Sequence, residues 1–104
     1  MGEVSPRLTQ SKDVVEYDMA LGIVFVPSAF RHNVSEESIR WVLSHYLADA
    51  VIEEGNETKR LAVGFDKSGN LLEIIYNELE DDRVKVFHAM KCRKQFRRDL
   101  GIEE

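Results

Sequence analysis

The sequence predicts one α+β domain, with an antiparallel sheet of three to four strands, a long helix packed on that sheet and a short basic helix at the C-terminus. Three observations support this fold class. A chain of 104 residues has room for a single hydrophobic core. One central segment carries apolar residues at helical spacing. Three later segments rich in strand-forming residues are joined by short polar links, which are typical of antiparallel neighbours.

The N-terminal region divides into two parts. Residues 1–11 contain Ser, Pro, Thr and Gln with little apolar content, which predicts a flexible tail ahead of a single domain spanning residues 12–104. Residues 13–27 read "DVVEYDMALGIVFVP", and their content of Val, Ile, Phe and Tyr favours β-structure. We expect this segment to form either one strand or two strands divided near Leu21–Gly22.

The central segment has the signals of a helix that starts after Ser35. Ser35 is a favourable N-cap, Glu36 and Glu37 suit the first turn, and Val34 and Ile39 have the spacing of a hydrophobic staple. These signals predict a helix from Ser35 to Val51, whose core-facing stripe consists of Ile39, Val42, Leu43, Tyr46, Leu47, Ala50 and Val51. The segment ends at Gly55–Asn56, either directly or after a short extended piece at Val51–Glu54.

Three strands and a short helix are expected after it. The strand segments are Lys59–Asp66, Leu71–Leu79 and Arg83–His88, and the links "KSGN" and "EDD" predict an antiparallel meander. The last helix ends near Gly101, and its apolar face is predicted to comprise Ala89, Cys92, Phe96 and Leu100.

Composition narrows the function classes. The longest apolar stretch, Ala20–Pro27, is too short to cross a bilayer, and the N-terminus lacks the pattern of a secretion signal, so we expect a cytoplasmic protein without membrane contact. Neither a glycine-rich phosphate loop nor a cofactor motif is present. The three histidines, His32, His45 and His88, lack the short spacings of metal ligands, so no metal or other cofactor is expected.

Basic residues cluster near the C-terminus although the formal net charge is -5. Residues 83–98 contain seven Lys and Arg residues and no acidic residue. This run is either a solvated helix face or a site for phosphate groups. The position of His88, at the junction of strand and helix, favours the second interpretation. Arg31 and His32, just ahead of the long helix, are placed to help hold an anion.

Two further features have open interpretations. Glu73 lies inside an apolar strand, where it either lines a site on the sheet or sits in water at the rim. Trp41, His45 and Ala48 are predicted to lie opposite the apolar stripe of the long helix. They form either a contact surface for a partner or a surface covered by residues 13–27.

Three stretches, "RHNVSEESI", "RLAVGFDKSGNLLEIIY" and "RVKVFHAMKCRK", resemble the BrnT-like toxins, a branch of the RelE superfamily of toxin–antitoxin ribonucleases. The resemblance covers roughly residues 30–98. Arg31 and His32 match a basic residue and histidine of that family, Arg60 matches a strand arginine, and His88 and Ala89 match a Ser-Ala pair. Met90 stands where the family has an arginine, a charge that Lys91 or Arg93 can supply.

The resemblance implies a RelE-like fold and a metal-independent endoribonuclease, the toxin of a bacterial toxin–antitoxin pair. Such enzymes cleave RNA, including ribosome-bound mRNA, by attack of the adjacent 2′-hydroxyl. His88 would then be the general base or acid, and Arg60, Arg93 and Arg97 would stabilise the transition state. The partners implied are a ribbon-helix-helix antitoxin and possible further copies of the chain. The alternative is a catalytically silent domain that binds RNA or protein. The remaining residues expected to contact RNA phosphates are Arg31, His32, Arg83, Lys85, Lys91, Lys94 and Arg98.

Overall fold

A computed structural model describes residues 22–102 of the chain. The tail predicted for residues 1–11, and the part of segment 13–27 before residue 22, lie outside the described residues. The strands are β1 (Ile23–Phe25), β2 (Ala48–Val51), β3 (Lys59–Phe65), β4 (Leu71–Glu78) and β5 (Val84–Lys91). The helices are the 3-10 helix η1 (Pro27–Phe30), α1 (Glu36–Ser44) and α2 (Lys94–Asp99).

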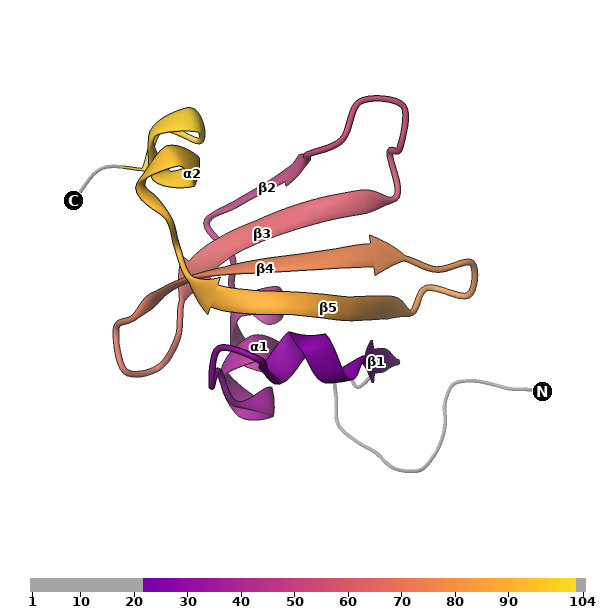
Figure 1. The fold of residues 1–104 in the computed structure, drawn as a ribbon, viewed down its shortest axis with the longest axis horizontal. Coiled ribbons are helices and arrows are strands. Elements are labelled where there is room, and N and C mark those ends of the chain that lie inside the picture. The colour runs from indigo at the N-terminus through magenta and orange to yellow at the C-terminus, as the bar shows by residue number, and fades with distance from the viewer. Residues whose placement is uncertain (1–21, 103–104) are drawn as a thin grey trace.

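The predicted α+β class and the antiparallel meander β3–β4–β5 are confirmed, but the sheet is larger than expected and mixed. Its five strands are ordered β1-β5-β4-β3-β2, and β1 runs parallel to β5 (Figure 1). Short links reveal only strands that are neighbours in sequence. β1 pairs with a strand far along the chain, and the intervening segment passes through η1 and α1, so the link lengths carried no signal of this pairing.

The helix α1 packs on one face of the sheet but is shorter than predicted. Its N-terminus begins as expected, because the Ser35 hydroxyl accepts a hydrogen bond from the Ser38 backbone N–H at 3.0 Å. It ends at Ser44, because the chain then crosses strand β3 at Gly64, where a Cβ atom would lie 3.0 Å from Tyr46 Cα. Tyr46 and Leu47, predicted in the core, are therefore 46% and 57% exposed.

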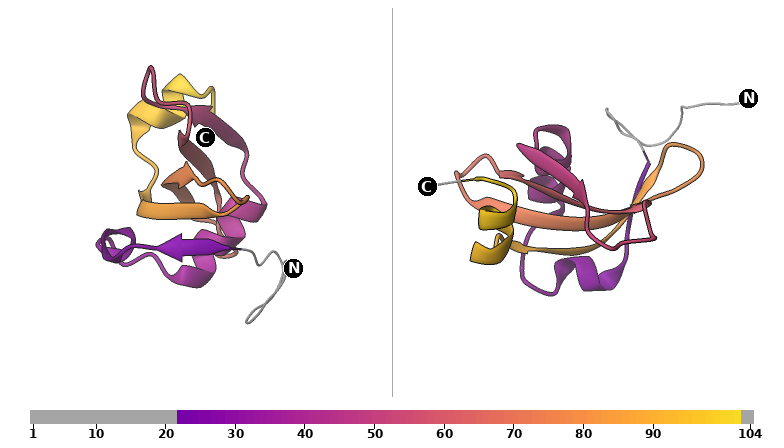
Figure 2. Two further views of the ribbon diagram at one scale, coloured as in Figure 1. Left: turned by 90° about the vertical axis from the view of Figure 1, so that its right-hand side faces the viewer. Right: turned by 90° about the horizontal axis from the view of Figure 1, so that it is seen from above.

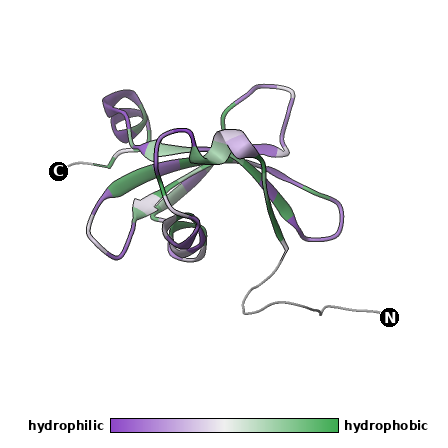
Figure 3. Ribbon diagram, turned by 60° about the horizontal axis from the view of Figure 1, so that its bottom comes forward, coloured by the Kyte–Doolittle hydropathy of each residue, from purple (hydrophilic) through white to green (hydrophobic). Residues whose placement is uncertain are grey.

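The core is divided between the two faces of the sheet, with α1 and α2 on opposite sides (Figure 2). Ile39 and Val42 of α1 pack on one face, whereas Phe96 and Leu100 pack with Leu61 on the other. Figure 3 shows the apolar residues concentrated along the strands, while α2 is mostly hydrophilic. Among residues 22–102, no helix combines the length and the apolar character needed to span a membrane.

The predicted apolar face of the C-terminal helix is wrong in part. Ala89 belongs to β5 and is buried on the α1 side, and Cys92 precedes α2. The strand β5 continues through Lys91, three residues beyond the predicted end at His88. His88 therefore lies within the sheet and not at the end of a strand.

Candidate functional site

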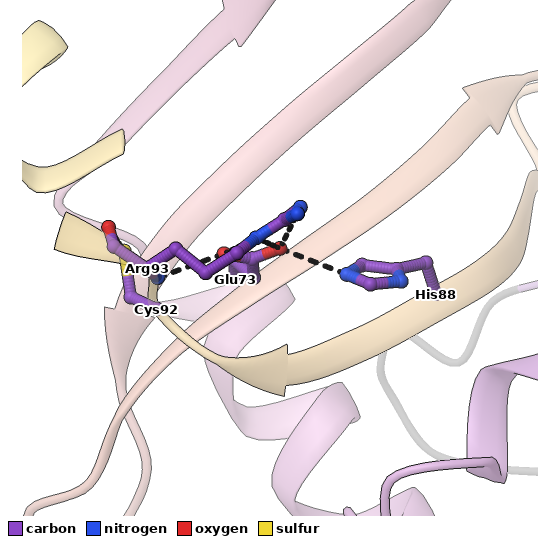
Figure 4. Close-up of polar contacts among 4 residues, drawn as sticks. All are labelled: Glu73, His88, Cys92 and Arg93. Atoms are coloured by element: carbon purple, nitrogen blue, oxygen red, sulfur yellow. Dashed lines mark hydrogen bonds and ion pairs between the residues drawn. The ribbon is translucent and has the colours of Figure 1, made fainter. Parts of the chain in front are cut away.

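The side chain of Glu73 is the centre of the strongest polar cluster in the described residues. Strand β4 places it on the α2 face of the sheet, where it is 0% exposed. A carboxylate removed from water is costly unless cations and hydrogen-bond donors surround it. Glu73 has both kinds of partner, and they come from His88 and Arg93 (Figure 4).

His88 reaches this carboxylate because of an irregularity in strand β5. Ile75 pairs with His88 whereas the next residue, Tyr76, pairs with Val86, so Phe87 is an extra residue on β5. Such a bulge turns the following side chains to the other face of the sheet. His88 Nε2 lies 2.8 Å from Glu73 Oε2, and Ala89 points into the α1 side of the core instead.

Arg93, in the turn between β5 and α2, completes the coordination of Glu73. Its backbone N–H donates to Oε1 at 2.9 Å, and its Nη2 donates to Oε2 at 2.7 Å. Its Nε lies 3.2 Å from Oε1 and 3.1 Å from Oε2. None of these contacts uses Nη1, and the Arg93 side chain is 51% exposed. The guanidinium therefore keeps donors directed away from Glu73.

A second histidine approaches from the loop between η1 and α1. The rings of His32 and His88 meet edge to face, with their centroids 5.7 Å apart. Strand β1 pairs with β5 only as far as Val86. The helix η1, which follows β1 in the chain, therefore lies beside the bulge at Phe87. There the Ser28 hydroxyl donates to the Phe87 carbonyl at 2.7 Å and fixes η1 beside His88. The loop then carries exposed His32 to the site.

The electrostatics of the cluster keep Glu73 ionised. Burial raises the pKa of this carboxyl, but the hydrogen bonds from Arg93 and His88 and the charge of Arg93 outweigh burial, so the pKa lies below its usual value. The ion pair also raises the pKa of Arg93. An ionised carboxylate only accepts hydrogen bonds. His88 Nε2 is therefore the protonated donor, and Nδ1 is the nitrogen left to exchange a proton.

Arg60, expected at the same site as His88, lies on the opposite face of the sheet. It pairs in register with Tyr76, whose side chain belongs to the α1 side of the core. Its Nε donates to Asp49 Oδ1 at 3.1 Å, and the Tyr76 hydroxyl lies 3.3 Å from the same carboxylate. Burial, followed by the charge of Asp49, raises the pKa of Tyr76 to about 12. This cluster ties the edge strand β2 to β3 and β4.

The other predicted phosphate ligands are distributed around the molecule. Arg31 is exposed beside His32, and Lys85 lies on the His88 face of β5. Arg83 precedes β5, at the end of the sheet away from Arg93, and binds Asp81 at 3.0 Å.

The remaining predicted phosphate ligands follow His88 in the chain. Lys91 is exposed and pairs with Leu72, which places it on the α1 face. Lys94 and Arg98 are exposed on α2, and Arg97 there is half-buried.

The predicted partner surface is only partly assembled. Trp41 and His45 stack with their ring centroids 3.8 Å apart, and Lys67 Nζ lies 4.9 Å from the centre of the Trp41 ring. Ala48 does not share this helix face, because it belongs to strand β2. An open groove of about 400 Å³ runs beside Trp41 between α1 and the β3–β4 turn, with Glu37 and Lys67 among its lining residues.

Sequence reasoning left the role of Glu73 open, and the structure places it at the centre of the site. The signal was a single charged residue inside an apolar strand, since such a residue needs partners when it is buried. No sequence pattern indicated the bulge that brings His88 to it. No three His, Cys, Asp or Glu side chains of the described residues are grouped as metal ligands. No protein-family model, curated protein or solved structure matches this chain.

Proposed function

We propose that this protein is a metal-independent endoribonuclease that cleaves RNA by attack of the 2′-hydroxyl on the adjacent phosphate. The observation that carries the proposal is the pair of imidazoles, His32 and His88, whose ring centroids are 5.7 Å apart beside the half-exposed guanidinium of Arg93. Two proton-transfer groups and a cation are what this reaction requires of a protein.

The two histidines divide the proton transfers. One takes the proton of the 2′-hydroxyl as that oxygen bonds to phosphorus. The other gives a proton to the 5′-oxygen as its bond to phosphorus breaks, and the products are a 2′,3′-cyclic phosphate and a 5′-hydroxyl. Glu73 is fully buried, so it is a positioning residue that orients His88 and Arg93.

Arg93 supplies the positive charge that the phosphorane needs. In the proposed relation to BrnT-like toxins, Met90 stands where the family has an arginine. Met90 pairs with Glu73 in the sheet, and Arg93 brings a guanidinium to the same carboxylate. Arg97, one helical turn after Arg93, is the second proposed contact to phosphate. Arg60 is not among the proposed contacts to phosphate, because it lies on the face of the sheet opposite His88.

From the same proposed relation we infer that the protein acts in the bacterial cytoplasm as the toxin of a toxin–antitoxin pair, on a RelE-like fold. Its partner would be a ribbon-helix-helix antitoxin. The groove beside Trp41 lies between α1 and the β3–β4 turn, and α1 packs on the sheet face opposite His88. An antitoxin or a second copy bound there would leave His32 and His88 accessible.

The test is cleavage of a labelled single-stranded RNA in the presence of a chelator. We expect cleavage products that end in a 2′,3′-cyclic phosphate, and no cleavage where a 2′-deoxynucleotide replaces the cleaved nucleotide. A parallel reaction with translating ribosomes keeps its magnesium, which ribosomes require. Cleavage that stops with the chelator and returns with a divalent ion would refute the mechanism.

A silent, RNA-binding domain is the second candidate function. The observation that favours it is that both Nε and Nη2 of Arg93 already donate to Glu73. This bonding competes with any phosphate for the same guanidinium. RNA bound without cleavage, both in free solution and on ribosomes, would establish this candidate.

A further inference from the structure

A second set of polar and aromatic residues lies on the His88 face of the sheet, toward the β4–β5 turn. Asn77 of β4 pairs with Lys59 of β3 on one side and with Lys85 of β5 on the other. Paired residues in neighbouring strands point to the same face. The two lysines therefore flank Asn77 in one row across three strands.

Phe87 connects this row to the proposed active site. As the extra residue of the bulge, it precedes His88 directly, and its ring centre lies 5.8 Å from Lys59 Nζ. The Ser28 hydroxyl holds its carbonyl at 2.7 Å, so the backbone at Phe87 is fixed. A partly exposed aromatic ring beside a lysine on the face of a sheet is an arrangement with which proteins stack bases of single-stranded RNA.

Asn77 has an unsatisfied hydrogen-bond acceptor. Its Oδ1 atom is covered by protein and has no hydrogen-bond partner. Most covered polar atoms are bonded, so this oxygen can accept a hydrogen bond from a group other than the protein, such as water or a ligand. Lysine side chains are flexible. A nucleobase N–H that enters between Lys59 and Lys85 would supply the donor.

The row is partly exposed and its charge suits RNA. Figure 1 shows α2 at the end of the sheet where β5 finishes, whereas the Lys59–Asn77–Lys85 row lies toward the β4–β5 turn, and its three residues are partly exposed. Lys59 binds Glu53 at 3.0 Å, but the Glu53 side chain is 53% exposed. Ion pairs this exposed are weak, so an RNA phosphate can replace the carboxylate.

We infer that Phe87, Asn77, Lys59 and Lys85 form a nucleotide subsite next to the scissile phosphate. One base stacks on Phe87 and donates to Asn77, while its phosphates contact the two lysines. This inference rests on the proposed function for the position of the scissile phosphate, but the binding itself does not require cleavage.

The experiment measures binding of a fluorescent 2′-O-methyl oligoribonucleotide, which cannot be cleaved by 2′-hydroxyl attack. Phe87→Leu keeps apolar bulk and removes the aromatic face, so we expect affinity to fall about five- to a hundredfold. Phe87→Tyr keeps the face and should bind like the unaltered protein. The matched control is Phe65→Leu, an exposed aromatic residue at the other end of β3, which should leave affinity unchanged.

The outcomes separate this inference from the proposed function. Equal affinity of Phe87→Leu and Phe87→Tyr, with both variants folded by circular dichroism, would overturn the subsite even if the protein cleaves RNA. Loss of affinity in Phe87→Leu alone would support the subsite even if no RNA is cleaved. An equal loss in Phe65→Leu would also overturn it, because the effect would then not be local.

Discussion

Glu73 determines the arrangement of the site, although it is too deeply buried to meet a substrate. Its carboxylate accepts hydrogen bonds from His88 and from both the backbone and the side chain of Arg93. Each of these bonds has a charged partner, and such bonds contribute roughly 1.5–3 kcal/mol. The residue thereby joins strands β4 and β5 to the turn before α2, and a change at Glu73 should alter stability and activity together.

The ion pair makes stability depend on pH in a defined direction. The pKa of Glu73 is lowered by folding, so the ionised form stabilises the protein above the ordinary carboxyl pKa of about 4.3. This stabilisation is lost as the pH falls through the lower value of the folded state. We expect Glu73→Gln to reduce the free energy of unfolding by about 2–3 kcal/mol at pH 7, less than for a fully buried pair because Arg93 is half exposed.

Urea unfolding at pH 7 and at successively lower pH checks this prediction. The difference between the unaltered protein and Glu73→Gln should shrink as the pH falls below the ordinary carboxyl pKa, and it should be smallest below the lower pKa of the folded state, where both side chains are neutral. Glu36→Gln is the control, since Glu36 is exposed in α1 and binds exposed Arg40. A difference of the same size at every pH would mean that charge is not what Glu73 contributes.

At the scale of elements, the bulge in β5 and the short strand β1 create the site together. The bulge turns His88 to the face of Glu73, and the end of β1 lets η1 bring His32 to the same edge. Regular alternation from Val86 would have buried His88 under α1 instead. A bulge has no distinct sequence signal here, so alternation alone could not predict which face His88 occupies.

The same element geometry predicts that Arg60 serves stability and not cleavage. Arg60→Leu removes the main partner of Asp49, and we expect the free energy of unfolding to fall by about 1–2 kcal/mol. Because Arg60 and His88 lie on opposite faces of the sheet, RNA cleavage should change by less than about twofold. Thermal unfolding and cleavage rates measure the two effects, with exposed Arg40→Leu as the control. A large loss of cleavage at unchanged stability would contradict this prediction and show that Arg60 acts in cleavage.

At the scale of the whole molecule, an acidic chain presents a local basic surface. The formal net charge is -5, but Lys59, Lys85 and Arg93 share the face of the sheet that carries His88. Exposed charges farther apart than about 8–10 Å are screened at physiological salt. The local charge therefore affects the binding of an RNA phosphate more than the net charge does.

This charge distribution predicts how salt affects RNA binding. Each phosphate neutralised on single-stranded RNA contributes a slope of about −0.7 to the dependence of log affinity on log salt. Lys59→Gln should reduce the magnitude of the slope by about this amount. Lys67→Gln should not, because Lys67 lies over Trp41 in the β3–β4 turn. Fluorescence anisotropy at several salt concentrations gives the slopes, and equal slopes for both variants would contradict the proposed surface.

The sequence was sufficient for the local features of the fold and insufficient for its long-range ones. The N-cap at Ser35 and the Gly69 turn of the β3–β4 hairpin follow local rules, and both were predicted. The end of α1 at Ser44 depends on close passage over Gly64, and the parallel pairing of β1 depends on a strand distant in sequence. Likewise, His88 and Arg93 were predicted as site residues from their residue types. That Glu73 is their common partner could be seen only from the register of the sheet.

The central claim is that His32 and His88 carry out the proton transfers of RNA cleavage. Its most direct test is the single-turnover cleavage rate of a labelled RNA, without metal, for His32→Ala and His88→Ala. His45→Ala is the control, because His45 stacks on Trp41 in the region of α1. We predict that each of the first two substitutions lowers the rate by about 10²–10⁴-fold while RNA is still bound, and that His45→Ala leaves it unchanged. Cleavage at the unaltered rate by both His32→Ala and His88→Ala would contradict the claim.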